Sequence, residues 1–133
     1  MAAVIADTHA AIWYLLQSPR LSEAALRRLE ETVQGGDPIL LPSICVVEMI
    51  YLVEKARLPT QAWDRLQGAL SQPDSGLVVA ALDEAVARAV SRVPRAEVPD
   101  LPDRIIAATA LHLGLPLVSR DRHIQAPEIE VVW

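Results

Sequence analysis

The stretch Ala2-Ala3-Val4-Ile5-Ala6-Asp7 is a short apolar run that ends on an acid. A continuous apolar run of this length is typical of a strand buried on both faces, as in a parallel sheet covered by helices. A carboxylate that follows such a strand directly lies near the edge of the sheet, where it needs a hydrogen-bond donor or a metal ion. The stretch therefore predicts a parallel α/β fold with a polar site at the end of its first strand.

Strand and helix patterns alternate along the rest of the chain. Apolar runs predict further strands at residues 39–41, 76–81, 117–119 and 129–132. Helical spacing predicts helices at residues 10–16, 23–34, 43–55, 60–70, from 84 onward and 103–113. We expect Ser22, Ser43 and Asp83 to cap three of these helices, the segment from 94 to 102 to form a loop, and the very apolar last helix to pack deep against the sheet. Alternating strands and helices imply right-handed crossovers and a sheet covered on both faces.

Composition limits the class of protein. The 133 residues are enough for one domain with a single core and too few for two. The net charge of −5 argues against a protein that holds nucleic acid through a general basic surface, although local arginines could still do so. Cys45 is the sole cysteine, which excludes an internal disulfide and fits a reducing cytosol, and its apolar setting indicates a buried core residue. No stretch is apolar over the roughly 18 residues of a membrane span, so we expect a soluble, cytoplasmic protein that does not bind a membrane.

Four acids stand where a strand ends or a helix begins: Asp7, Glu48, Asp103 and Asp121. In a parallel sheet these places meet at one edge, where α/β proteins place their ligands. Carboxylates gathered there cannot all stay ionised without a counter-ion, and oxygen ligands without a His/Cys set favour Mg²⁺ or Mn²⁺ over zinc. Such an ion activates water and neutralises phosphate oxygens, so phosphodiester hydrolysis is the natural chemistry.

Each acid alone has an ordinary explanation. Asp103 opens a helix and would interact favourably with its dipole, and Asp121 could be an exposed turn residue. Glu48 is harder to explain, because it lies in an apolar segment and a structural role requires a buried partner that the sequence does not supply. One metal site accounts for all four acids more economically than four separate explanations.

Four segments, in this order, resemble the motifs of PIN-domain ribonucleases, in particular the VapC toxins of VapBC toxin–antitoxin pairs. They are Asp7-Thr8-His9-Ala10-Ala11-Ile12-Trp13, Ser43 through Glu48, Asp103-Arg104-Ile105-Ile106-Ala107-Ala108-Thr109-Ala110, and Ser119-Arg120-Asp121. The resemblance implies a PIN-like three-layer α/β/α sandwich over residues 1–133, with a parallel sheet of four to five strands. It also implies that the four acids hold Mg²⁺ or Mn²⁺, that RNA is cut to a 5′-phosphate and a 3′-hydroxyl, and that a VapB-type antitoxin inhibits the enzyme.

The chain departs from the family pattern just before the third motif. Many relatives carry His-Arg-Asp-Pro there, whereas this chain has Val98-Pro99-Asp100-Leu101. Asp100 remains as a candidate fifth metal ligand, but any RNA contact from the missing His and Arg is lost.

Residues around the acids suggest supporting roles. Thr8 and Ser119 are expected to donate hydrogen bonds to the carboxylates or to metal-bound water, which would fix ligand orientation. Three arginines are candidates for contacts with RNA phosphates: Arg104, Arg120 and Arg122. We also expect the chain to form a homodimer.

Other functions remain open on sequence grounds. Phosphatases of the haloacid dehalogenase type also place Asp after a first strand with Thr nearby, but they resemble one another in a second Asp two positions later, where this chain has His9. A free-standing PIN nuclease without an antitoxin is a second alternative, and a non-catalytic PIN-like binding module is a third. A small upstream gene encoding a DNA-binding N-terminus would favour the toxin.

Overall fold

Within residues 2–121, 124 and 128–133, which the computed structural model describes, five parallel strands form one sheet in the order β3-β2-β1-β4-β5. The predicted α/β fold with a parallel sheet is therefore confirmed. The strands are β1 (Val4–Ala6), β2 (Ile39–Pro42), β3 (Leu77–Ala80), β4 (Leu117–Val118) and β5 (Val131–Val132).

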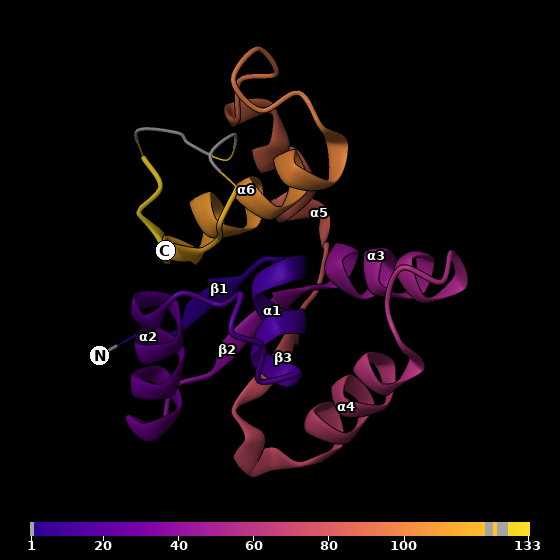
Figure 1. Cartoon of the computed structure of the whole chain (residues 1–133). Helices are drawn as coiled ribbons and strands as arrows, with labels where there is room; N and C mark the ends of the chain where they lie inside the picture. Colours follow the sequence, from indigo (N-terminus) through magenta and orange to yellow (C-terminus); the bar gives the residue numbers. More distant parts are fainter. Residues whose placement is uncertain (1, 122–123, 125–127) are drawn as a thin grey trace.

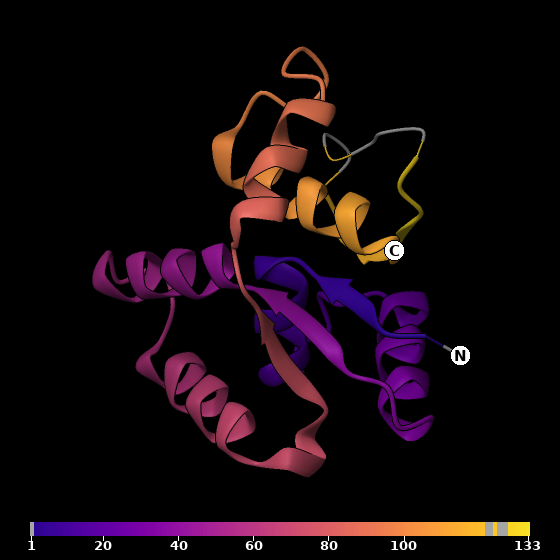
Figure 2. The same cartoon turned by 180° about the vertical axis from the view of Figure 1, so that it is seen from behind.

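Helices cover both faces of this sheet. Figures 1 and 2 show α5 and α6 gathered on one side, with α1, α2 and α4 on the other. The chain runs from β1 outward to β3 and then returns past β1 to β4, so right-handed crossovers place the two groups of helices on opposite faces. The helices are α1 (Thr8–Leu15), α2 (Glu23–Gln34), α3 (Ser43–Glu54), α4 (Thr60–Ser71), α5 (Glu84–Ala89) and α6 (Leu101–Leu113), with 3₁₀ turns η1 (Pro73–Ser75) and η2 (Val90–Arg92).

The central strand β1 fixes the position of the first acid. Its three residues are fully buried, and Ile5 pairs with Leu40 of β2 on one side and with Leu117 of β4 on the other. The backbone N–H of Asp7 then donates to the carbonyl of Val118 at 3.2 Å. Asp7 is therefore held at the carboxyl edge, the edge of the sheet at which its parallel strands end.

Two of the three predicted helix caps are present. The side chains of Ser22 and Asp83 accept backbone N–H groups in the first turns of α2 and α5. The predicted capping role of Ser43 is wrong: Pro42 is the N-cap of α3, and the Ser43 hydroxyl accepts the N–H of Leu82 at 3.1 Å. This contact joins segments 39 residues apart, so local sequence signals could not reveal it.

The helix α6 is as deeply buried as its apolar sequence predicts. Its residues Ile105 to Ala110 are all buried, and it packs against α5 and α3. It begins at Leu101, so Pro102 belongs to its first turn rather than to the preceding loop, a position in which proline fits without loss of a helical hydrogen bond. Gly114 ends it with φ of 66°. In the described part of the chain, no helix is long and apolar enough to cross a membrane.

Candidate active site

A cavity of about 870 Å³ lies at the carboxyl edge of the sheet. It collects residues from the ends of strands and the starts of helices that are far apart in sequence. Its lining includes all four predicted acids together with the fifth candidate: Asp7, Glu48, Asp100, Asp103 and Asp121. The structure thus brings the predicted acids to one place.

Asp7 is the most buried of these acids, with 6% of its surface exposed. Its Oδ1 accepts the N–H of Ala10 at 2.9 Å, so it caps α1, and its Oδ2 accepts the hydroxyl of Ser119 at 2.5 Å. Burial raises the pKa of Asp7, and the hydrogen bonds from Ser119 and Ala10 offset part of this rise because they stabilise the charged form. The carboxylate is therefore fixed by two donors from different elements.

Glu48 is the acid that Thr8, one of the two expected hydroxyl donors, contacts. The hydroxyl of Thr8, which is 4% exposed at the start of α1, donates to Oε1 of Glu48 at 2.5 Å. The helix that carries Glu48 is also less buried than its apolar sequence implied, because Val47 and Tyr51 are exposed by 48% and 59%. Glu48 is consequently half-buried at the cavity rather than enclosed in the core.

Asp103 lies among other negative charges. Burial is the largest cause that raises its pKa to about 7, followed by the charges of Asp100 and Asp121, a hydrogen bond with Asp121 and the charge of Glu48. Asp100 is the N-cap of α6, and its Oδ2 accepts the N–H of Asp103 at 3.2 Å. The raised pKa indicates that these carboxylates are close enough to oppose one another's ionisation.

Cys45 lies behind the acids in the core and is fully buried. Burial raises the pKa of its thiol far above the usual range, and the charges of Asp7, Glu48 and Asp103 act in the same direction. The thiol is therefore protonated and unreactive, as expected for a core residue.

The donor set suits a hard divalent cation. All the acidic groups of the cavity offer oxygen, which Mg²⁺ and Mn²⁺ prefer, and their mutual repulsion would be relieved by positive charge. Among the described residues, however, no three His, Cys, Asp or Glu side chains are grouped closely enough to hold an ion as they stand. The carboxylates share a cavity without converging on one point.

The three arginines expected to contact RNA have different positions. Arg120 lines the cavity and lies over the ring of Trp13, with its Cζ 5.8 Å from the ring centroid. Arg104 is absent from the cavity lining, and its guanidinium donates instead to the carbonyls of Val90 and Val93. Arg122 lies outside the described residues.

Arg20 and Trp133 also line the cavity, although they lie outside the four motif segments and the sequence reasoning singled out neither. Trp133 follows β5 directly, so the rule that placed the acids at the ends of parallel strands would also have placed this ring at the carboxyl edge. Arg20 lies in the irregular segment between α1 and α2, and no pattern in the sequence predicts the path of this segment or its contact with the cavity.

Comparisons with known proteins give a consistent result. Residues 4–129 match the model of the PIN domain. The chain is 29% identical over 140 residues to Ribonuclease VapC22 of Mycobacterium tuberculosis, with both chains covered completely. Among solved structures, it resembles VapBC2 from Rickettsia felis bound to a promoter DNA fragment (18% identity, TM-score 0.72, covering 98% of this chain and 97% of that one). It also resembles DNA-bound VapBC from Salmonella typhimurium (24% identity, TM-score 0.72, 98% and 97%). At these identities the structural similarity shows the fold.

Proposed function

The chain belongs to the PIN domain family, and we propose that it is a Mg²⁺- or Mn²⁺-dependent endoribonuclease toxin that a VapB-type antitoxin inhibits. The observation that carries the proposal is the set of carboxylates in one cavity, with the pKa of Asp103 raised to about 7 by burial and by neighbouring negative charge. Similarity to a ribonuclease and to toxin–antitoxin complexes supports the choice of RNA as substrate and of an antitoxin as partner.

The four acids Asp7, Glu48, Asp103 and Asp121 would hold the ion, with Asp100 as a candidate fifth ligand. When bound, a divalent ion activates water for attack on a phosphodiester and neutralises the phosphate oxygens. The protein's own contribution is to position the carboxylates. Thr8 orients Glu48, and Ser119 orients Asp7, through the hydrogen bonds described above.

Phosphatases of the haloacid dehalogenase type also resemble one another in a lysine near the site, and the position of the one lysine of this chain disfavours that alternative. Lys55 follows the last turn of α3, where its Nζ lies over the ring of Tyr51, and it is absent from the cavity lining. A non-catalytic binding module is disfavoured by the electrostatics, because clustered carboxylates with a raised pKa destabilise a protein that never binds a cation.

The assembly that we propose is a homodimer bound to its antitoxin. Three apolar residues on α3, which are at least 36% exposed, offer a surface that a second copy would cover: Val47, Ile50 and Tyr51. Light scattering of the wild-type chain and of an Ile50→Glu, Tyr51→Ser double variant tests this surface. A monomeric wild-type protein at micromolar concentration would contradict the dimer.

Cleavage assays test the nuclease activity directly. The purified chain is incubated with a panel of cellular RNAs in Mg²⁺, in Mn²⁺ and in EDTA, and we expect cleavage only with a divalent ion. Asp7→Asn keeps the shape of the side chain but removes its charge, and should reduce the rate by orders of magnitude. Asp74→Asn, at an exposed position in η1, is the matched control. Cleavage by Asp7→Asn at the wild-type rate would show that the site is assigned wrongly.

A further inference from the structure

One side of the acidic cavity is built from planar side chains, which we call the aromatic wall: His9, Trp13, Arg120 and Trp133. The His9 and Trp13 ring centroids lie 5.5 Å apart, and those of Trp13 and Trp133 lie 5.8 Å apart. The guanidinium of Arg120 lies 5.8 Å from the Trp13 ring. Trp13, which is 9% exposed, is thus the buried centre around which the other three are arranged.

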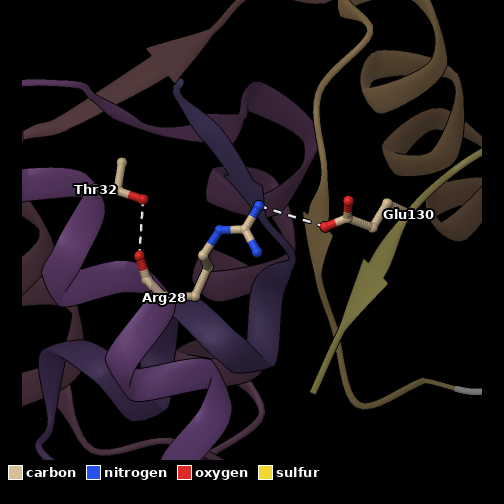
Figure 3. A network of polar contacts seen from close by, with 3 residues as sticks. All are labelled: Arg28, Thr32 and Glu130. Carbon is tan, nitrogen blue, oxygen red and sulfur yellow. Dashed lines mark hydrogen bonds and ion pairs between the residues drawn. The ribbon is translucent and has the colours of Figure 1, made fainter. Parts of the chain in front are cut away.

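The position of Trp133 is fixed by the sheet. The preceding residue, Val132, pairs with Val118 of β4, and its carbonyl accepts the N–H of Ser119 at 3.1 Å. Trp133 therefore follows the strand beside the residue that hydrogen-bonds Asp7. Figure 3 shows a second attachment, in which Arg28 of α2 reaches Glu130, with 3.3 Å between the guanidinium nitrogen and the carboxylate oxygen.

Packing accounts for Trp13 and for part of Trp133, which contacts the hydrophobic core, but not for His9 and Arg120. Trp13 belongs to the hydrophobic core, whereas His9 and Arg120 are exposed and Trp133 is half-buried. These three line the same cavity that carries the carboxylates. Aromatic rings and guanidinium planes are the surfaces on which proteins stack unpaired nucleobases.

We infer that the aromatic wall is a binding subsite for one unpaired nucleobase of the RNA, which stacks on His9 and Trp133 while Arg120 contacts a neighbouring phosphate. The inference rests on the proposed nuclease function, because it places this base next to the bond that is cut. Trp13 is a positioning residue that holds the three contacting side chains. A base inside a duplex cannot reach the subsite, so the subsite selects RNA with an unpaired nucleotide at the cleavage position.

Steady-state kinetics on a short single-stranded RNA test the subsite. We expect His9→Ala and Trp133→Leu each to raise KM about 10-fold, with kcat changed less than about 2-fold, because stacking acts on substrate binding. The matched control is Trp63→Leu, which alters a half-buried tryptophan of α4 outside the cavity lining. His9 is exposed, so its substitution tests the wall even if the Trp133 variant folds poorly. An unchanged KM in His9→Ala and in a folded Trp133→Leu protein overturns the inference.

An abasic substrate separates stacking from a structural effect. Abasic residues are placed in turn along the RNA, and one position next to the cleaved bond should raise the KM of the wild-type enzyme about 10-fold. In the His9→Ala, Trp133→Leu double variant, an abasic residue at the same position should change KM little, because the side chains on which the base stacks are already absent. An equal abasic penalty in both proteins overturns the inference.

Equilibrium binding distinguishes failure of the subsite from failure of the nuclease. Binding of the same RNAs is measured with Mg²⁺ in the Asp7→Asn background, where no turnover is expected. If the wild-type chain cleaves no RNA but the abasic position and the wall variants weaken binding together, the nuclease proposal fails and the subsite stands. If the wild-type chain cleaves RNA but neither the abasic position nor the wall variants weaken binding, the nuclease proposal stands and the subsite fails.

Discussion

The hydroxyl of Ser119 donates a 2.5 Å hydrogen bond to Oδ2 of Asp7, which lies 112 positions earlier in the chain. The same oxygen of Ser119 accepts the backbone N–H of Asp121 at 3.0 Å. One hydroxyl therefore connects two of the four acids, and it can do so because β1 and β4 are neighbours in the sheet. In the proposed metal site, Ser119 would therefore orient Asp7 and Asp121 and would not itself bind the ion.

Ser119→Ala should reduce cleavage about 10- to 100-fold, as is usual when a partner that orients a metal ligand is removed. The pKa of Asp7 should rise further, since the hydrogen bond from Ser119 lowers it in the intact protein. Because protons then compete more strongly with the metal, the loss should be larger at low pH and smaller at high Mn²⁺. Rates measured over a series of Mn²⁺ concentrations check this. Ser91→Ala, which removes an exposed hydroxyl outside the cavity lining, should leave the rates unchanged.

The stability of the metal-free chain should fall as pH rises from about 4 to 7. The pKa of Asp103 is about 7 in the folded protein and 3.8 ordinarily, so between these values the folded state binds more protons than the unfolded state. Below this window both states carry the proton and the penalty disappears. Urea unfolding in EDTA at several pH values measures the slope, and Asp103→Asn should flatten it. A wild-type stability that increased more steeply with pH than that of Asp103→Asn would contradict this prediction.

Divalent ions should raise the thermal midpoint of the protein. An ion that binds only the folded state adds about 2.7 kcal/mol to the free energy of unfolding at 100 times its Kd. Asp103→Asn should be more stable than wild type without metal at pH 8, because one repelling charge is gone, yet it should gain less from Mg²⁺ or Mn²⁺. Calorimetry with EDTA or with millimolar ion compares the two proteins. No shift of the wild-type midpoint at millimolar ion would count against a metal site.

Much of the fold follows from the sequence because its signals are local. Apolar runs mark the strands, and parallel strands end at one edge, so the strand pattern alone predicts that Asp7 and Asp121 lie together, as they do in the cavity. The sequence predicted that Thr8 and Ser119 donate to carboxylates of the site, but not which acid each would contact. The Thr8–Glu48 contact and the Ser43–Leu82 contact depend on how segments about 40 residues apart pack together, and many packings satisfy the same hydrophobic pattern.

Arg104 should matter for stability and not for RNA binding. Its guanidinium donates to the carbonyls of Val90 and Val93, which ties η2 to α6. Arg104→Gln should lower the free energy of unfolding by about 1.5–3 kcal/mol, the usual contribution of hydrogen bonds to a charged group. Its KM for RNA should stay at the wild-type value well below the thermal midpoint. Arg120→Gln should raise the KM for RNA and change the free energy of unfolding little. If the two variants changed KM and stability alike, the separate roles given to Arg104 and Arg120 would be contradicted.

The chain should be toxic unless its antitoxin is present, because an uninhibited ribonuclease damages its own cell. Expression of the wild type should arrest growth, expression of Asp7→Asn should not, and co-expression with an adjacent small gene should restore growth. If expression of the wild type is harmless in its native host after the adjacent small gene has been deleted, the chain is not a toxin. A free-standing nuclease would then be the better description.

Two cavities are candidate binding sites for the proposed antitoxin. The acidic cavity suits an arginine side chain, whose guanidinium can contact a carboxylate through two hydrogen bonds. A second cavity of about 700 Å³, lined by apolar residues that include Trp13, Leu21 and Leu26, suits one face of an amphipathic helix.

Substituting each arginine of the antitoxin by alanine should identify one whose loss restores RNA cleavage in a mixture of the two proteins. Leu26→Glu should weaken the complex without reducing cleavage by the toxin alone, because Leu26 is 40% exposed and lines the second cavity but not the acidic one. Complexes that resist both changes would show that the antitoxin inhibits the enzyme from another surface.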